Sequence, residues 1–196
     1  RMNSDKKPMI FESHAHYDSQ QFDDDRDALL NSMQENGVGT IINSAADWDS
    51  VTEVVELAEK YPFVYAAVGM HPDEVGDLNE ERFAFMKSQC QKEKVVAVGE
   101  IGLDYYWDNE SHDTQKKWFI RQLELARELD LPVIIHSRDA AADTLEIMKE
   151  HGQGLRGRQA HTGAGLRVRQ EGRRAKADLR QAGTVRGYRC SLRKII

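Results

Sequence analysis

Short apolar runs recur along the first 155 residues, and polar positions follow each of them. Runs such as Met9-Ile10-Phe11 and Val133-Ile134-Ile135 have the length and composition of buried strands. The expected strand ends are spaced by 28, 27, 30 and 35 residues, and they fall near His16, Ser44, His71, Ile101 and His136. Each interval holds one strand, one helix and their connections, so the spacing predicts repeated βα units.

Apolar positions with helical spacing lie between these runs. A first helix is predicted around residues 25–36, ending at Gly37, and a second helix is predicted to be capped by Asp47. Two more begin near Asp113 and Asp139. Strands that alternate with helices in this way predict a parallel sheet covered by helices. The spacing alone does not separate an open doubly wound sheet from a closed barrel.

Four potential metal ligands stand where apolar runs end. His14 and His16 follow the first run, Glu100 follows residues 95–98, and His136 follows the last of the five runs. Side chains two positions apart share one face of a strand, so both histidines of the pair can approach one ion. Ligands at the same end of several parallel strands favour a barrel with a metal centre at its mouth. Histidines that are hydrogen-bonded within a core are the alternative.

Charge divides the chain near residue 155. Residues 1–155 carry 15 Lys and Arg against 31 Asp and Glu, whereas residues 156–196 carry 12 against 2. We therefore expect a polar arm over residues 1–8, a partial hydrolase barrel over 9–155 and an Arg/Gly-rich tail over 156–196. The tail fits a basic arm for nucleic acid or an acidic partner, or alternatively a sequence translated past a frameshift.

Composition limits the classes of protein. With 40% hydrophobic and 31% charged residues, the chain is expected to be globular, and we expect a monomer. No apolar run reaches the roughly 20 residues that cross a bilayer, and the first residues lack an apolar signal core, so we expect a cytoplasmic protein without membrane association. Cys90 and Cys190 do not have the spacing of a thiolate zinc site.

Five motifs occur in order between residues 9 and 155, and they are His14-Ala15-His16, Val68-Gly69-Met70-His71-Pro72, Val98-Gly99-Glu100-Ile101-Gly102-Leu103-Asp104-Tyr105, Gln115-Lys116 with Phe119 and Gln122-Leu123, and Pro132-Val133-Ile134-Ile135-His136-Ser137-Arg138. In order and spacing this set resembles the TatD family of metal-dependent deoxyribonucleases. The resemblance implies an α/β fold, a TIM-like (β/α)8 barrel, with one or two divalent ions (Mg, Mn or Zn). It also implies hydrolysis of DNA phosphodiester bonds, with single strands or 3′ ends as substrates. The barrel is incomplete, because about five βα units reach residue 150, whereas eight need roughly 240 residues.

The resemblance also assigns roles to individual residues. His14 and His16 would hold one ion, Glu100 would bridge two ions and take part in catalysis, and His136 would bind the second ion. His161 stands about where the family's next histidine ligand falls, although its neighbours depart from the family pattern. The acidic residue that ends the family's last strand and helps to activate water has no counterpart here, so we expect impaired activity.

His71 and Arg138 are candidates for substrate binding. His71 could meet a substrate phosphate or be satisfied within its loop, and Arg138 could hold a phosphate or pair with a carboxylate such as Asp104. The aromatic residues Tyr105-Tyr106-Trp107 could stack on unpaired bases or simply pack their loop. Two other functions stay open: hydrolysis of a small-molecule ester or amide, which the same barrel supports, and an inactive truncated product.

Overall fold

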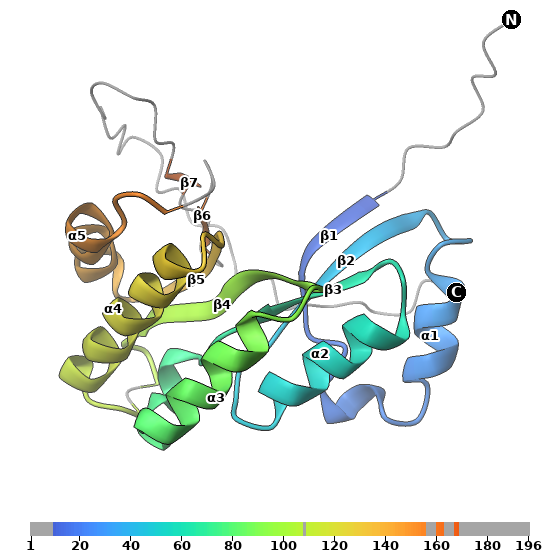
Figure 1. The fold of residues 1–196 in the computed structure, drawn as a ribbon, viewed down its shortest axis with the longest axis horizontal. Helices are drawn as coiled ribbons and strands as arrows, with labels where there is room; N and C mark the ends of the chain where they lie inside the picture. Colours follow the sequence, from blue (N-terminus) through green and yellow to red (C-terminus); the bar gives the residue numbers. More distant parts are fainter. Residues whose placement is uncertain (1–9, 108, 156–159, 163–166, 169–196) are drawn as a thin grey trace, which may run out of the picture.

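A sheet of parallel strands forms the centre of the computed structural model, which describes residues 10–107, 109–155, 160–162 and 167–168. Within these residues, strands pair in sequence order from the first to the seventh. All neighbours are parallel except the last pair, which is antiparallel. The strands are β1 (Ile10–Ala15), β2 (Val38–Ser44), β3 (Val64–Val68), β4 (Val95–Asp104), β5 (Val133–Arg138), β6 (Ala160–Thr162) and β7 (Arg167–Val168) (Figure 1).

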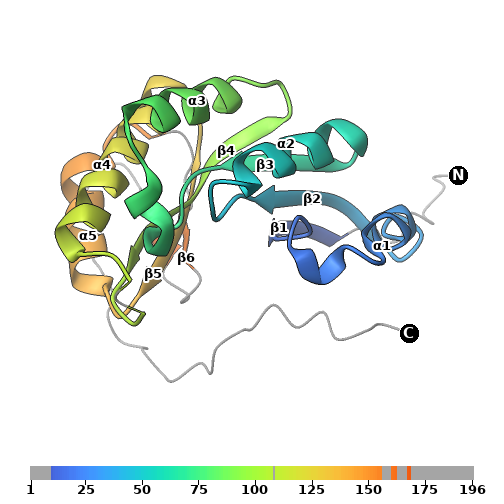
Figure 2. The same ribbon diagram turned by 90° about the horizontal axis from the view of Figure 1, so that it is seen from below.

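Helices follow each of the first five strands and cover one face of the sheet. They are α1 (Arg26–Ser32), α2 (Ser50–Lys60), α3 (Glu80–Cys90), α4 (His112–Glu128) and α5 (Ala141–His151), with the 3-10 helices η1 (Gln20–Phe22) and η2 (Pro72–Asp77). Figure 2 shows the sheet as a curved layer, with α3, α4 and α5 along the outside of the curve. Five consecutive βα units around a curved parallel sheet confirm the predicted part of a TIM-like (β/α)8 barrel.

The two faces of the sheet bury different sets of side chains. The main core lies between the sheet and the helices, where α4 contributes Trp118, Phe119 and Leu123. A smaller cluster consists of Ala67, Ala97 and Ile134, with Ile42 packed against it. Ala66 belongs to the main core and Ala67 to the smaller cluster, because successive strand residues point to opposite faces. The sheet is therefore buried on its helical face, and its inner face has a smaller cluster of alanine and isoleucine side chains.

Strand and helix starts follow the sequence prediction closely, but several ends differ. β3 ends at Val68, three residues before His71, and β4 continues past Ile101 to Asp104. α4 begins one residue before its predicted start. α2 begins at Ser50, and Asp47 Oδ1 accepts a hydrogen bond from the Ser50 amide at 2.9 Å. The N-cap of α2 is Asp49 rather than the predicted Asp47, and Asp47 instead bonds the first amide of the helix from the turn before it.

Two helical predictions need correction. The first helix ends at Ser32 rather than near Gly37, because residues 33–37 form a turn. In this turn the Val38 amide donates a hydrogen bond to the Met33 carbonyl at 2.9 Å. The sequence pattern also leaves α3 unpredicted. Its buried side chains are few and stand among charged residues, so the apolar stripe is weak.

Some sequence predictions concern residues outside the described ranges. These include the polar arm over 1–8, most of the tail over 156–196, and a short helix expected around residues 172–182. Only the short strands β6 and β7 are described beyond residue 155, so the boundary near that residue stays a prediction. In the part of the chain that is described, every helix is too short or too polar to cross a bilayer.

Gly102 allows β4 to pass close to β5 beside His136. Its φ is +147°, which L side chains rarely adopt, and a Cβ atom there would overlap the His136 carbonyl oxygen. Gly102 and His136 are also paired in the sheet register. A side chain at this position would push the two strands apart at a predicted metal ligand.

We expect Gly102→Ala to lower the free energy of unfolding by about 2 kcal/mol or more, because it adds backbone strain and overlap with β5. Gly37→Ala is the matched control. Gly37 also has a positive φ, +86°, but a Cβ atom added there would have nothing within 4 Å. Gly37→Ala should therefore lower the free energy of unfolding by only about 1 kcal/mol. Urea denaturation measures both variants. Equal destabilisation would show that contact with the His136 carbonyl is unimportant.

Candidate metal centre

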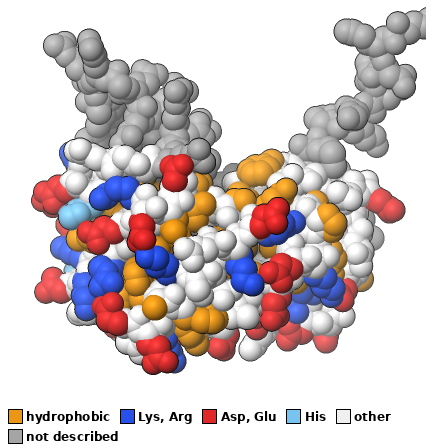
Figure 3. Space-filling view, in the orientation of Figure 1, with side chains coloured by type: hydrophobic (Ala, Val, Ile, Leu, Met, Phe, Trp, Pro, Cys, Tyr) orange, Lys and Arg blue, Asp and Glu red, His pale blue; other side chains and the backbone are white. Residues whose placement is uncertain are grey.

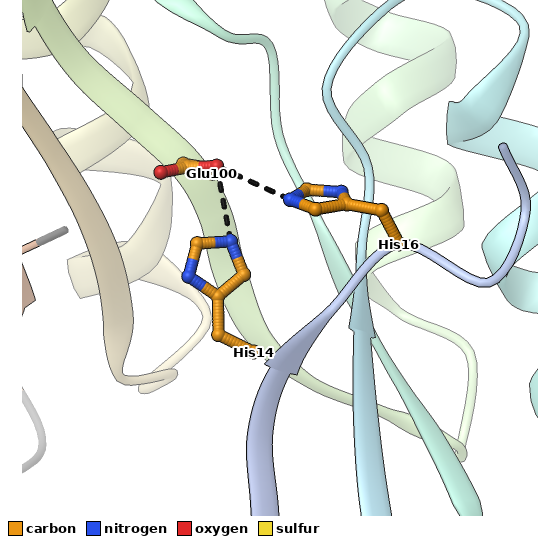
Figure 4. A group of neighbouring side chains, drawn as sticks. All are labelled: His14, His16 and Glu100. Atoms are coloured by element: carbon orange, nitrogen blue, oxygen red, sulfur yellow. Dashed lines mark hydrogen bonds and ion pairs between the residues drawn. The ribbon is translucent and has the colours of Figure 1, made fainter. Parts of the chain in front are cut away.

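The ends of three strands bring histidines around the carboxylate of Glu100, which is 5% exposed. Glu100 Oε2 lies 3.0 Å from His14 Nε2 and 3.6 Å from His16 Nε2. Glu100 Oε1 lies 3.3 Å from His136 Nδ1. Figure 4 shows His14 at the end of β1 and His16 just after it, both pointing toward the carboxylate on β4. The four predicted ligands of His14, His16, Glu100 and His136 therefore lie together.

Two of these imidazoles are oriented by a second hydrogen bond. His16 Nδ1 donates to the Ser44 carbonyl oxygen at 2.8 Å, and this bond turns its Nε2 toward Glu100. His136 Nε2 donates to Asp104 Oδ2 at 2.8 Å, and its Nδ1 faces Glu100. Histidine ligands of metals are commonly fixed in this way. Imidazole nitrogens and a carboxylate converging on one point fit a divalent cation.

Asp104 is a site residue that the sequence pattern does not mark as a ligand. It is the last residue of β4 and is 1% exposed. Together with His71 and His136 it forms a second group whose potential ligand atoms lie within 4.8 Å of one another. A signal for it exists in the sequence, because residues four apart on a strand point to the same face and Asp104 follows Glu100 at that spacing.

Burial and hydrogen bonding together set the charges of the centre. Burial alone would raise the pKa of Glu100, but hydrogen bonds from His136 and His14 hold that pKa well below its usual range. Burial lowers the pKa of His14 and of His136, yet the contacts with Glu100 outweigh it and raise both values. For His71, burial and the charge of His136 lower the pKa to about 4. The His71 ring is therefore neutral near pH 7.

An open hollow of about 720 Å³ leads to this centre. Its lining includes His16, His71, Glu100 and His136, and an acidic rim of Asp18, Asp47, Asp49, Glu53, Asp73 and Glu74. Burial raises the pKa of Glu53, and the charges of neighbouring carboxylates add to this. A negative hollow attracts cations and repels a phosphodiester unless that charge is offset. A second hollow of about 810 Å³ beside α1 and α2 has no histidine in its lining, so the candidate centre is the first hollow.

The other predicted site residues have different positions. The His71 ring packs edge-on against His136, with 4.2 Å between ring centroids. Arg138 does not pair with Asp104, whose carboxylate is bound to His136; its guanidinium carbon lies 3.7 Å from the centroid of the Tyr106 ring. His161 lies in β6, opposite Ile134 of β5. Its side chain is outside the described part of the structure, and its role as a ligand stays a prediction.

Two buried glutamines of α4 hold the strand ends that carry these residues. Gln115 Oε1 accepts from the Asp104 amide, and its Nε2 donates to the Asp104 carbonyl, both at 2.8 Å. Gln122 makes the same pair of contacts with Met70, at 2.7 Å and 3.2 Å. The glutamines are seven residues apart, so they lie on one face of the helix two turns apart. α4 therefore fixes the end of β4 and the segment before His71 relative to each other.

The sequence of the chain matches the family described as TatD related DNase over residues 11–165. The chain belongs to the TatD family. This match includes all the site residues described above, and its range also contains His161.

Individual TatD proteins are similar over most of this chain. It is 42% identical to a Bacillus subtilis protein named uncharacterized metal-dependent hydrolase YabD, over 74% of this chain and 56% of that protein. It is 31% identical to the 3'-5' ssDNA/RNA exonuclease TatD of Cronobacter sakazakii, over 90% of this chain and 66% of that protein. The crystal structure of the Escherichia coli TatD homologue YjjV superposes with a TM-score of 0.66 at 36% identity, over 72% of this chain and 56% of that one.

The chain thus spans little more than half the length of YabD and YjjV. A TatD-family hydrolase from Entamoeba histolytica, 24% identical, superposes with a TM-score of 0.68 over 55% of its own length. This structure supports the barrel fold of the described strands.

Removing two of the converging imidazoles should weaken metal binding. We expect the His14→Ala/His16→Ala double variant to bind Mn²⁺ or Zn²⁺ at least about tenfold more weakly than the unaltered chain. His151→Ala is the control, because His151 lies at the end of α5, away from the centre. Isothermal titration with each metal gives the affinities. Unchanged affinity in the double variant would exclude this centre.

Asp104 should act through the orientation of His136. We expect Asp104→Ala to weaken metal binding by about 10- to 100-fold, because the His136 ring loses the acceptor that fixes its tautomer. Asp143→Ala is the control. This variant also removes a carboxylate that accepts a side-chain hydrogen bond, but its donor is the Tyr105 hydroxyl, at 2.7 Å, rather than His136. Circular dichroism checks that both variants fold. A folded Asp104→Ala variant with full affinity would rule out this orienting role.

Proposed function

We propose that this chain carries the hydrolytic centre of a divalent-metal-dependent deoxyribonuclease that acts on single-stranded DNA, including its 3′ ends. The observation that carries this proposal is the convergence of three imidazoles on the buried Glu100 carboxylate at the ends of parallel strands. In barrel enzymes this end of the strands is where catalysis takes place. We propose one or two divalent ions at this centre, and Mg²⁺, Mn²⁺ and Zn²⁺ are the candidates.

The chemistry of the substrate explains why such a centre is useful. A phosphodiester is anionic and therefore resists attack by water. A divalent ion, once bound, offsets that charge and lowers the pKa of a coordinated water toward about 7. His14, His16, Glu100 and His136 are the residues that would hold it. The hydrogen bonds to the Ser44 carbonyl and to Asp104 orient two of these rings, so that the other nitrogen of each ring faces Glu100, where a bound ion would take its lone pair.

His71 has the properties of a phosphate-binding residue. Its Nδ1 accepts a hydrogen bond from the Asp73 amide at 3.3 Å, so the single proton of the neutral ring is on Nε2. Burial lowers the pKa of His71 to about 4, which keeps the ring neutral. We infer that the Nε2–H group donates to a non-bridging phosphate oxygen. A neutral donor can do so beside the cationic ligand set without adding another charge.

Nucleic acid as substrate is supported by the names of similar proteins. The Cronobacter sakazakii relative is named a 3'-5' ssDNA/RNA exonuclease, and a human protein that is 28% identical over 73% of this chain is named deoxyribonuclease TATDN3. On the face shown in Figure 3, acidic and basic side chains are interspersed over the helices, without a continuous basic stripe among the described residues. Binding of a strand would then depend on the metal centre more than on the outer surface.

A small-molecule ester or amide is the second candidate substrate. The names of YabD and YjjV specify a metal-dependent hydrolase without a nucleic acid. The same arrangement of ligands on a barrel supports several hydrolytic reactions. We also propose a cytoplasmic location and a monomeric state, and neither candidate substrate depends on them.

We expect metal-dependent release of nucleotides from a 3′-labelled single-stranded oligonucleotide, reduced by at least about 100-fold in Glu100→Gln, because this substitution removes the charge shared by the ligand set. Glu124→Gln, on the exposed side of α4, is the control. Gel analysis with Mg²⁺, Mn²⁺ or Zn²⁺ measures release.

Three results would contradict this proposal in different ways. Hydrolysis that persists in Glu100→Gln would place the activity elsewhere. Faster turnover of p-nitrophenyl acetate than of the oligonucleotide would favour the small-molecule function. Full metal binding with no turnover of either substrate would identify an inactive chain.

A further inference from the structure

Two exposed aromatic side chains stand beside the metal centre, in the loop that follows β4. Tyr106 is 54% exposed and Trp107 is 58% exposed, and their rings meet edge to face with centroids 4.9 Å apart. The guanidinium carbon of Arg138 lies 3.7 Å from the centroid of the Tyr106 ring and 5.3 Å from that of Trp107. We call these three side chains the aromatic platform. None of them is needed to hold a metal in the centre described above.

The platform is attached to the metal centre through Asp104. The amides of Tyr106 and Trp107 both donate to Asp104 Oδ1, at 2.9 Å and 3.2 Å, while Oδ2 of the same carboxylate accepts from His136. The backbone adds another connection, since the Tyr105 amide donates to the Arg138 carbonyl at 2.9 Å. One buried carboxylate therefore orients a predicted metal ligand and fixes the start of the platform.

The neighbouring residue holds the loop from its other side. The Tyr105 ring stacks on His112 with 3.6 Å between centroids, and its hydroxyl donates to Asp143 at 2.7 Å. Tyr105 thus accounts for the packing of the loop. Tyr106 and Trp107 stay more than half exposed although the loop is already anchored. Two adjacent exposed rings form an apolar surface that suits a ligand with a flat, weakly polar face.

We propose that the aromatic platform is a base-stacking subsite for the nucleotide next to the scissile phosphate, and this rests on the proposed nuclease function. Nucleobases stack on aromatic rings largely without regard to sequence. A guanidinium supported by a ring can contact the adjacent phosphate through its N–H groups. In a duplex the faces of a base are covered by its neighbours. The platform therefore selects an unpaired base, as at a single-stranded end.

A comparison of two ligands isolates the stacking contact. In the presence of Mn²⁺, isothermal titration of the whole chain should show that dAMP binds about tenfold more tightly than 2-deoxyribose 5-phosphate, which has the same phosphate and sugar but no base. Tyr106→Ala/Trp107→Ala should remove that advantage, so that the two ligands bind with equal affinity. Arg138→Gln should weaken both ligands. Phe85→Ala is the control, because Phe85 is an exposed ring on α3 that contacts Trp48.

The outcomes separate this inference from the proposed function. Equal affinities for dAMP and the sugar phosphate, an advantage for dAMP that persists in the double variant, or no binding of dAMP would each overturn the platform. Oligonucleotide hydrolysis that continues under those outcomes leaves the nuclease function intact. A tenfold preference for dAMP in a chain that hydrolyses no DNA would support the platform and contradict only the catalytic proposal.

Discussion

The buried negative charge of Glu100 is the constraint on which the site depends. A carboxylate that is 5% exposed at the interior of a sheet must be compensated, because the protein interior solvates a charge poorly. The structure compensates it with His14 of β1, with His16 just after that strand and with His136 of β5, so these segments must lie level with Glu100 of β4. A divalent cation would satisfy the same requirement more fully, and the arrangement that keeps the charge buried also prepares the site for metal.

The strands must therefore be held in register, and backbone features outside the centre contribute to this. Gly102 brings β4 against β5 where any side chain would separate them. Gln115 and Gln122 satisfy buried amide and carbonyl groups just beyond β3 and at the end of β4 that the sheet leaves unpaired. Each glutamine would be costly to replace, because a buried polar backbone group without a partner lowers stability by about 1–3 kcal/mol. Gln115 and Gln122 of α4 thus support the site through the backbone of Asp104 and Met70 rather than by facing the metal centre.

The sequence predicts the strands and the main ligands for one reason: both follow from local pattern. His136 stands directly after an apolar run and His14 and His16 shortly after another, and the shared geometry of parallel strands brings them together without knowledge of any contact. Asp104 is harder to predict, because β4 is expected to end near Ile101 and instead continues to Asp104. Whether a polar residue belongs to a strand or to the loop after it depends on pairing with the next strand, which a single sequence does not specify.

Arg138 illustrates a second limit of sequence reasoning. Its charge suggests either a phosphate or a carboxylate such as Asp104 as partner, but Asp104 is already occupied by His136 and two amides. The guanidinium lies on Tyr106 instead, a choice that depends on the conformation of the loop after β4. This contact places a positive charge beside an otherwise acidic hollow. Under the proposed nuclease function, the acidic rim would repel the phosphates of a strand until a cation offsets that charge, and a base of the strand would then meet the platform. The proposal therefore implies that metal binds before nucleic acid.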